Sequence, residues 1–244
     1  MLAFLVNAIK IIFVLGFLVL IHEGGHFCVA KLCKVKVNEF AIGFGPILVS
    51  RTKGETKYAL HAIPLGGYVS MEGEEEHSDA EGSFSNAGAL KKIAIVLAGG
   101  TVNILFGLLV YFILVVAVGN PIIIAGKATL GLVTTMFAGL KELFTGQVDV
   151  NQMMGIVGIS DVVVKTSGIA DFTYIMAIIS LSLGFTNLLP LPPLDGGKVV
   201  IYLMEAIRRK PIKEELELKI QTLGLAFIII LSIYVTYNDI IRIL

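Results

Sequence analysis

Cysteine and charged residues are both scarce in this chain of 244 residues. Only two cysteines occur, Cys28 and Cys33, so the sequence offers neither a disulfide framework nor a thiolate zinc site. Charged residues make up 16%, and the acidic and basic side chains balance at 19 each, so nothing favours a nucleic acid or another strongly charged partner. Hydrophobic residues make up 56% and the mean hydropathy is +0.87, which together indicate a membrane protein rather than a soluble domain.

Four apolar runs are long enough to cross a bilayer as helices. They cover residues 2–31, 93–118, 172–189 and 220–237. The first run contains Lys10 and has no small-residue cleavage site, so we expect it to stay as a transmembrane helix rather than to be removed as a signal peptide. Residues 128–146 have helical spacing, and there we expect an interfacial amphipathic helix in preference to a fifth, short span.

Residues 35–71 have the pattern of a β-hairpin, because β-branched and aromatic residues alternate with polar ones between glycines and prolines. Open strand edges cannot face lipid, so these strands must pack on protein, line a wet cavity or lie at the surface. Such an edge could pair with an extended peptide. Residues 72–89 are acidic and contain glycine and serine, which indicates a solvated loop.

Lysine and arginine are concentrated in two of the connections between the spans. Of the 19 basic residues, 13 lie between the first and second spans or between the third and fourth. Basic residues near span ends mark the cytoplasmic side, so both termini are expected outside, in a multi-pass protein of the cell membrane. The loop of residues 120–171 is then extracytoplasmic, and His22 lies toward the cytoplasmic side.

The first span ends in a cluster of ionisable residues, His22, Glu23 and His26, within the segment HEGGH. Residues at i and i+4 share one face of a helix, so the two imidazoles can bind one metal ion. Glu23 is placed to take a proton from a water activated by that metal, as in the H-E-x-x-H motif of metallopeptidases. Ionisable groups beside a long apolar run are functional candidates by default. The alternative interpretation is a helix end with a few interfacial polar groups.

A catalytic zinc site takes three protein ligands and leaves one position open, so a third ligand is needed. Asp195 is the best candidate, because the prolines and glycines of the segment NLLPLPPLDGG hold it on a kinked piece of chain near the depth of the histidines. The alternative for Asp195 is a turn residue in a D-G-G bend. His61 and His77 are weaker candidates, since each lies in a polar or strand-like segment.

Together these motifs resemble the site-2 protease family of intramembrane zinc metalloproteases (peptidase family M50), and most of all its bacterial regulator-of-sigma-factor branch. The resemblance rests on HEGGH, on GFG followed by IPLGGYV, on AGGTVN in the second span and on NLLPLPPLDGG. It implies that His22, His26 and Asp195 are the zinc ligands and that Glu23 is the general base.

The resemblance also implies how substrates are held and what they are. The segment IPLGGYV, with Gly67 and Tyr68, resembles the edge of a membrane-reentrant β-hairpin that pairs with the extended substrate, and Asn187 matches an asparagine that contacts the substrate backbone. The implied substrates are single-span membrane proteins, such as anti-sigma factors or remnant signal peptides, cleaved within the bilayer. The implied process is regulated intramembrane proteolysis.

Three features depart from the pattern of that branch. Residues 120–171 are too few to hold the PDZ domain that its members usually carry between the second and third spans. Gly100 and Ile156 stand where the family commonly has proline, and Ser182 stands where related proteases have a second substrate-contacting asparagine. The zinc and base positions are intact, so these departures concern substrate selection and regulation.

We therefore expect a polytopic α-helical membrane protein with about four transmembrane helices and a small membrane-reentrant β-hairpin on the cytoplasmic side. Its expected function is that of an intramembrane zinc endopeptidase. The alternatives are a catalytically silent zinc-containing scaffold or transporter, and a protein that binds transmembrane segments without cleaving them. Glu23 argues against the scaffold, because a structural zinc site fills its fourth position and has no use for a free carboxylate beside the metal. The oligomeric state is not indicated by the sequence.

Overall fold

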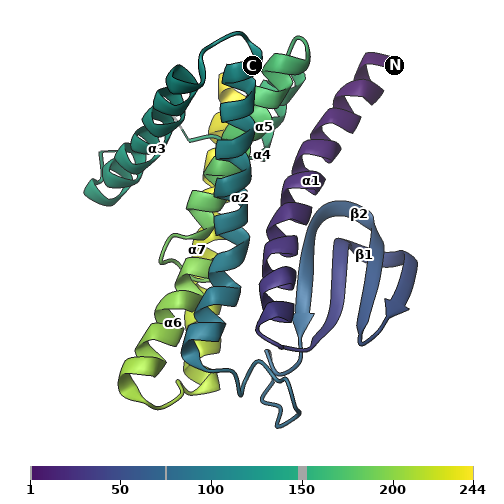
Figure 1. Ribbon diagram of the computed structural model, residues 1–244, viewed down its shortest axis with the longest axis vertical. Coiled ribbons are helices and arrows are strands. Elements are labelled where there is room, and N and C mark those ends of the chain that lie inside the picture. The colour runs from purple at the N-terminus through teal and green to yellow at the C-terminus, as the bar shows by residue number, and fades with distance from the viewer. Residues whose placement is uncertain (1, 75, 148–152, 244) are drawn as a thin grey trace.

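The computed structural model describes residues 2–74, 76–147 and 153–243. Figure 1 shows long helices lying side by side, with both termini at the same end of the bundle. The elements in chain order are α1 (Leu2–Leu32), β1 (Val37–Lys53), β2 (Thr56–Met71), α2 (Ala89–Ala117), α3 (Ile122–Thr145), α4 (Ile156–Val164), α5 (Ile169–Asn187), α6 (Asp195–Arg208) and α7 (Glu214–Ile243). The protein is thus mostly helical, with one small antiparallel sheet, as the sequence predicts.

Five helices are long and apolar enough to cross a membrane: α1, α2, α3, α5 and α7. Four of them contain the predicted spans, apart from small differences at the ends. The fifth candidate is residues 122–142 of α3, for which the sequence favoured an interfacial helix. The sequence prediction considered residues 128–146, whereas the helix begins at Ile122 and so includes three further isoleucines and Ala125. The mean hydropathy of the candidate span is 1.6, equal to that of α5.

The two strands of the sheet are both bent, so β1 pairs with β2 twice. Phe40, for example, lies opposite Val69 on one side and Tyr58 on the other. The bend in β1 contains Gly43 and Gly45 with φ of +83° and +86°, a left-handed conformation that favours glycine. A side chain at Gly43 would also overlap the carbonyl of Ile63. As a result, residues 67–71 of β2 form one edge of the sheet and residues 47–53 of β1 form the other.

The helices around α2 approach one another very closely. A Cβ atom at Gly25 of α1 would lie 2.7 Å from the carbonyl oxygen of Ala98 in α2, and one at Gly184 of α5 would lie 2.6 Å from that of Gly100. Small residues allow this kind of backbone contact between membrane helices. The close contacts fix α1 and α5 against the two sides of α2.

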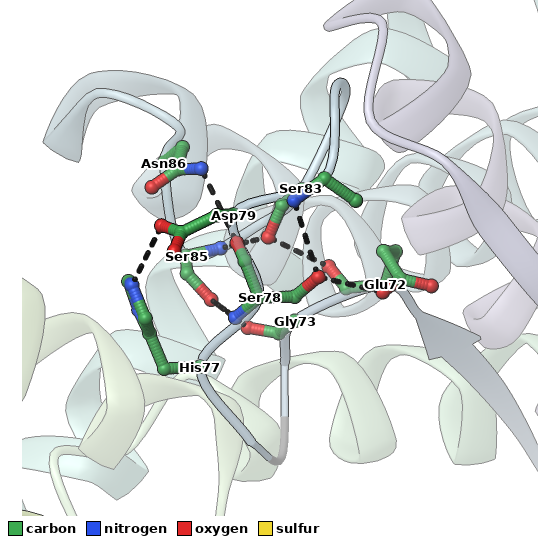
Figure 2. A network of polar contacts seen from close by, with 9 residues as sticks. Glu72, Gly73, His77, Ser78, Asp79, Ser83, Ser85 and Asn86 are labelled. Atoms are coloured by element: carbon green, nitrogen blue, oxygen red, sulfur yellow. Dashed lines mark hydrogen bonds and ion pairs between the residues drawn. The ribbon is translucent and has the colours of Figure 1, made fainter.

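The connection between β2 and α2 is more ordered than the expected solvated loop. Ser78 donates its hydroxyl to Glu72 Oε1 at 2.7 Å, and Ser85 donates to the carbonyl of Gly73 at 2.6 Å (Figure 2). The loop also buries Phe84, whose ring contacts that of Tyr202 in α6. Serine side chains thus replace backbone hydrogen bonds that a strand or helix would supply. Phe84 joins the core beside α6, while most of the other described residues of the loop stay at least partly exposed, as predicted.

Candidate active site

The two histidines of HEGGH lie one helical turn apart near the end of α1 and point in the same direction. Both are buried, and their Nε2 atoms lie 3.2 Å apart. Gly25 has no side chain, so the backbone of α2 lies directly against α1 at this position. The predicted pairing of the two imidazoles on one helix face is therefore present in the structure.

Asp195 reaches the histidines because the chain turns sharply between α5 and α6. The predicted helix break is present, since α5 ends at Asn187 and α6 begins at Asp195. Neither glycine after Asp195 has room for a side chain: a Cβ at Gly196 would overlap the carbonyls of residues 188 and 189, and one at Gly197 would lie 2.7 Å from Pro192 N. This tight packing holds Asp195 at the first position of α6.

The three side chains fit a zinc ion. Asp195 Oδ2 lies 3.2 Å from His22 Nε2 and 3.4 Å from His26 Nε2. Tetrahedral zinc with bonds of about 2.0–2.1 Å requires ligand atoms about 3.3–3.4 Å apart, which agrees with these separations. Oδ2 is also buried and receives no hydrogen bond from the described residues, although a buried carboxylate oxygen normally has a partner. Among the described residues no other three such side chains come this close together.

The other two histidines do not join this group. His61 lies in the sheet, where its Nδ1 is 2.6 Å from the carbonyl oxygen of Gly45. His77 lies in the loop before α2, exposed and 3.2 Å from Asp79 Oδ1 (Figure 2). Of the three candidates for a third ligand, the structure therefore brings only Asp195 to the two histidines.

One edge of the sheet passes beside Glu23. A Cβ atom at Gly67 would lie 3.2 Å from Glu23 Cγ and 2.8 Å from the carbonyl oxygen of Ala41, so a side chain there would crowd both. Glu23 itself is half-buried. Tyr68, the next residue, packs against Phe44 with ring centroids 6.4 Å apart. The edge of residues 67–71 is therefore the part of the sheet that a peptide at Glu23 would meet.

Asn187, the third predicted substrate-binding residue, is half-buried at the last position of α5, before the turn that leads to Asp195.

Lys198 connects α6 to the loop before α2. Its ammonium group lies 2.9 Å from Glu74 Oε1. Burial is the largest single effect and would lower the pKa of Lys198, but Glu74, Tyr202 and Asp195 together outweigh it and raise the pKa above its ordinary value. Lys198 therefore stays charged one helical turn after Asp195, and the ion pair fastens the loop to the helix that carries the aspartate.

Helix α2 also contributes to the site, although no residue of this helix was among the predicted site residues. The one signal in the sequence was the motif AGGTVN, which contains Gly99 and Asn103. His26 Nδ1 lies 2.8 Å from the carbonyl oxygen of Ile95, and His22 Nδ1 lies 3.3 Å from the side-chain amide of Asn103. Between them, a Cβ atom at Gly99 would overlap His26 Nε2 and lie 2.7 Å from His22 Cε1. A backbone carbonyl leaves no trace in the residue type, and an asparagine in a membrane helix more often bridges two helices.

The fold and this group of side chains define a polytopic membrane protein with a metal site inside its helical bundle. The model of peptidase family M50 matches residues 10–231, so the chain belongs to this family, the site-2 protease family. It is accordingly an intramembrane zinc metalloprotease.

Relatives from several bacteria carry the same kind of name. A protein of Clostridium acetobutylicum named "Putative zinc metalloprotease" is 28% identical over 330 residues that cover 96% of this chain and 97% of the relative. One of Campylobacter jejuni with that name is 27% identical, over 96% of this chain and 93% of the relative. A third, of Neisseria meningitidis, is 44% identical over 104 residues, which are 41% of this chain and 23% of the relative. The first alignment is longer than the 244 residues of this chain, so that relative contains residues with no counterpart here.

Proposed function

We propose that this protease cleaves peptide bonds within the transmembrane segments of single-span membrane proteins, with His22, His26 and Asp195 as zinc ligands and Glu23 as general base. The observation that carries the proposal is the spacing of 3.2–3.4 Å among the three ligand atoms, together with a strand edge beside Glu23 that pairs with no second strand among the described residues. A zinc ion held there would act as a Lewis acid toward water and toward the scissile carbonyl.

Glu23 performs the proton transfers. Its carboxylate accepts a proton from the attacking water and later delivers it to the amine of the leaving peptide. Glu23 is half-buried on α1, directly after His22 and beside Gly67 of the sheet edge. It can therefore reach both the proposed zinc site and a peptide on that edge.

A substrate helix must unwind before it is cut, because its carbonyls are bonded within the helix. The edge of residues 67–71 supplies replacement hydrogen bonds, since within the described residues it pairs with β1 on one side only. Gly67 lets the peptide backbone come close to Glu23. Tyr68 follows it on the same edge, and the side-chain amide of Asn187 supplies a further hydrogen bond to the unwound backbone.

The surface of the sheet supports a site near the cytoplasmic face. Large apolar side chains, including Phe44, Ile47 and Ile63, are exposed around the bends of the strands, whereas Arg51 and Lys53 are exposed beside the turn at the opposite end. We accordingly place the bends in the membrane and the turn in the cytoplasm. Both termini lie at one end of the bundle (Figure 1). We propose that this end faces outside.

The substrate class follows from the family resemblance: single-span proteins such as anti-sigma factors or remnant signal peptides. The experiment is cleavage of a panel of such segments by the purified protein in detergent, with mass spectrometry of the products. The proposal expects cuts inside the apolar span that stop when zinc is chelated and resume when zinc is returned. Cuts confined to the soluble flanks of the reporters would refute it.

A further inference from the structure

Three residues of α2 line up behind the two histidines. Ile95, Gly99 and Asn103 are spaced four apart, so they share one face of the helix. The carbonyl of Ile95 faces His26 Nδ1, the bare backbone of Gly99 makes room for both rings, and the amide of Asn103 faces His22 Nδ1. Each histidine thus has one ring nitrogen toward Asp195 and the other toward α2.

The contact with Ile95 fixes the proton of one histidine. A carbonyl oxygen only accepts hydrogen bonds, so Nδ1 of His26 must carry the hydrogen and donate it. A neutral imidazole carries one N–H, and the other nitrogen keeps its lone pair. Nε2 of His26 therefore faces Asp195 and His22 with a lone pair, which is the form that binds a metal.

The contact with Asn103 decides which ring nitrogen of His22 carries the hydrogen. The outcome depends on the orientation of the amide, because a side-chain amide fits its site with either its oxygen or its nitrogen toward the partner. If the amide nitrogen of Asn103 faces His22, Nδ1 of His22 must accept the hydrogen bond. The hydrogen of His22 then lies on Nε2, which faces Asp195 and His26 and could not bind a metal. With the amide oxygen toward His22, Oδ1 accepts from Nδ1–H, and Nε2 is free to bind.

We infer that Asn103 is a positioning residue for zinc: its Oδ1 accepts the Nδ1–H of His22 and fixes the tautomer whose Nε2 lone pair faces the metal. The inference rests on the proposed assignment of His22 as a ligand. Histidine ligands of metals usually donate their second N–H to a protein acceptor, and loss of that acceptor weakens metal binding about 10- to 100-fold.

The competing role for Asn103 is to bridge α2 and α5, and the structure assigns that contact to other atoms. Ser180 of α5 donates its hydroxyl to the backbone carbonyl of Asn103 at 2.8 Å, and both residues are fully buried. The helix contact therefore uses the backbone of Asn103, while its side chain faces His22. Ser180→Ala removes the bridge and leaves the amide in place, which makes it a matched control.

The experiment measures zinc affinity by chelator competition in the full chain, for wild type and the variants Asn103→Leu, Asn103→Asp and Ser180→Ala. Asn103→Leu removes the acceptor at similar volume and is expected to weaken zinc binding about 10- to 100-fold. Asn103→Asp keeps an oxygen that accepts from Nδ1–H and is expected to bind zinc about as tightly as wild type. Ser180→Ala is expected to keep wild-type affinity. Thermal unfolding of each zinc-free variant shows that it is folded.

Wild-type affinity in Asn103→Leu, or an equal loss in Ser180→Ala, would overturn the inference. A second measurement needs no variant: nitrogen NMR of labelled histidine in the zinc-loaded protein is expected to show the metal on Nε2 of His22 and the hydrogen on Nδ1, and an Nε2 that does not bind the metal would also overturn it. The variants His22→Ala and Asp195→Ala separate this inference from the proposed function. If they keep zinc, the ligand assignment itself is wrong; if they lose it while Asn103→Leu does not, only the role of Asn103 is wrong.

Discussion

The substitution Gly99→Ala tests the metal site with the addition of one methyl group. The new Cβ would overlap His26 Nε2 and lie 2.7 and 2.8 Å from Cε1 and Nε2 of His22, whereas ordinary contacts of this kind are 3.4–4 Å. At least one imidazole must therefore move by more than half an ångström, which exceeds the tolerance of about 0.2 Å on zinc–ligand distances. We expect zinc affinity to fall by about 100-fold or more, which is about 3 kcal/mol.

Gly24→Ala is the matched control, because Gly24 lies inside HEGGH and a Cβ there would meet nothing within 4 Å. It should keep zinc and activity, and should stabilise α1 by up to about 1 kcal/mol, since alanine favours a helix over glycine. The assay is zinc content and chelator competition for both variants, with thermal unfolding of the zinc-free protein. Wild-type affinity in Gly99→Ala would refute the geometry described for the site.

Three further predictions concern the sheet edge beside Glu23 and the loop between β2 and α2. Gly67→Ala should abolish cleavage but keep zinc, because its methyl group would crowd Glu23 and the carbonyl of Ala41 at the substrate edge; zinc content and reporter cleavage check this. Glu74→Gln should lower cleavage without zinc loss and speed hydrogen exchange in the loop before α2, because Lys198 loses its partner. Ser78, and less strongly Asn38, donate to Glu72 and hold its pKa below the ordinary 4.5. That stabilisation is complete above about pH 4.5 and is lost as the pH falls through the lower folded-state pKa. The protection of the loop amides, relative to their exchange in an unfolded chain at the same pH, should therefore fall only in acid, and Glu72→Gln should remove this pH dependence.

Local patterns were enough to predict how the proposed zinc ligands come together. The pairing of His22 with His26 depends only on helix periodicity, and the break before Asp195 depends only on proline and glycine. The apolar runs predicted four of the five candidate spans for the same reason, because length and hydropathy are local properties.

Contacts between distant segments were not predictable in this way. β1 pairs with β2 twice because both strands bend at glycines. The same sequence pattern fits a simple hairpin with straight strands equally well, so the bends could not be predicted. The burial of Phe84 depends on α6, which comes much later in the chain. The carbonyl oxygen that faces His26 belongs to the backbone of Ile95, so the residue type at this position does not indicate the contact.

The most direct test of the account measures zinc content and cleavage in the same samples of wild type and Glu23→Gln, reconstituted in lipid vesicles with a single-span reporter. The account predicts equal zinc in both proteins, with cuts inside the span by wild type and none by Glu23→Gln. Equal cleavage by the two proteins would show that Glu23 is not the general base. A wild type that binds no zinc yet still cleaves would contradict the metal site itself.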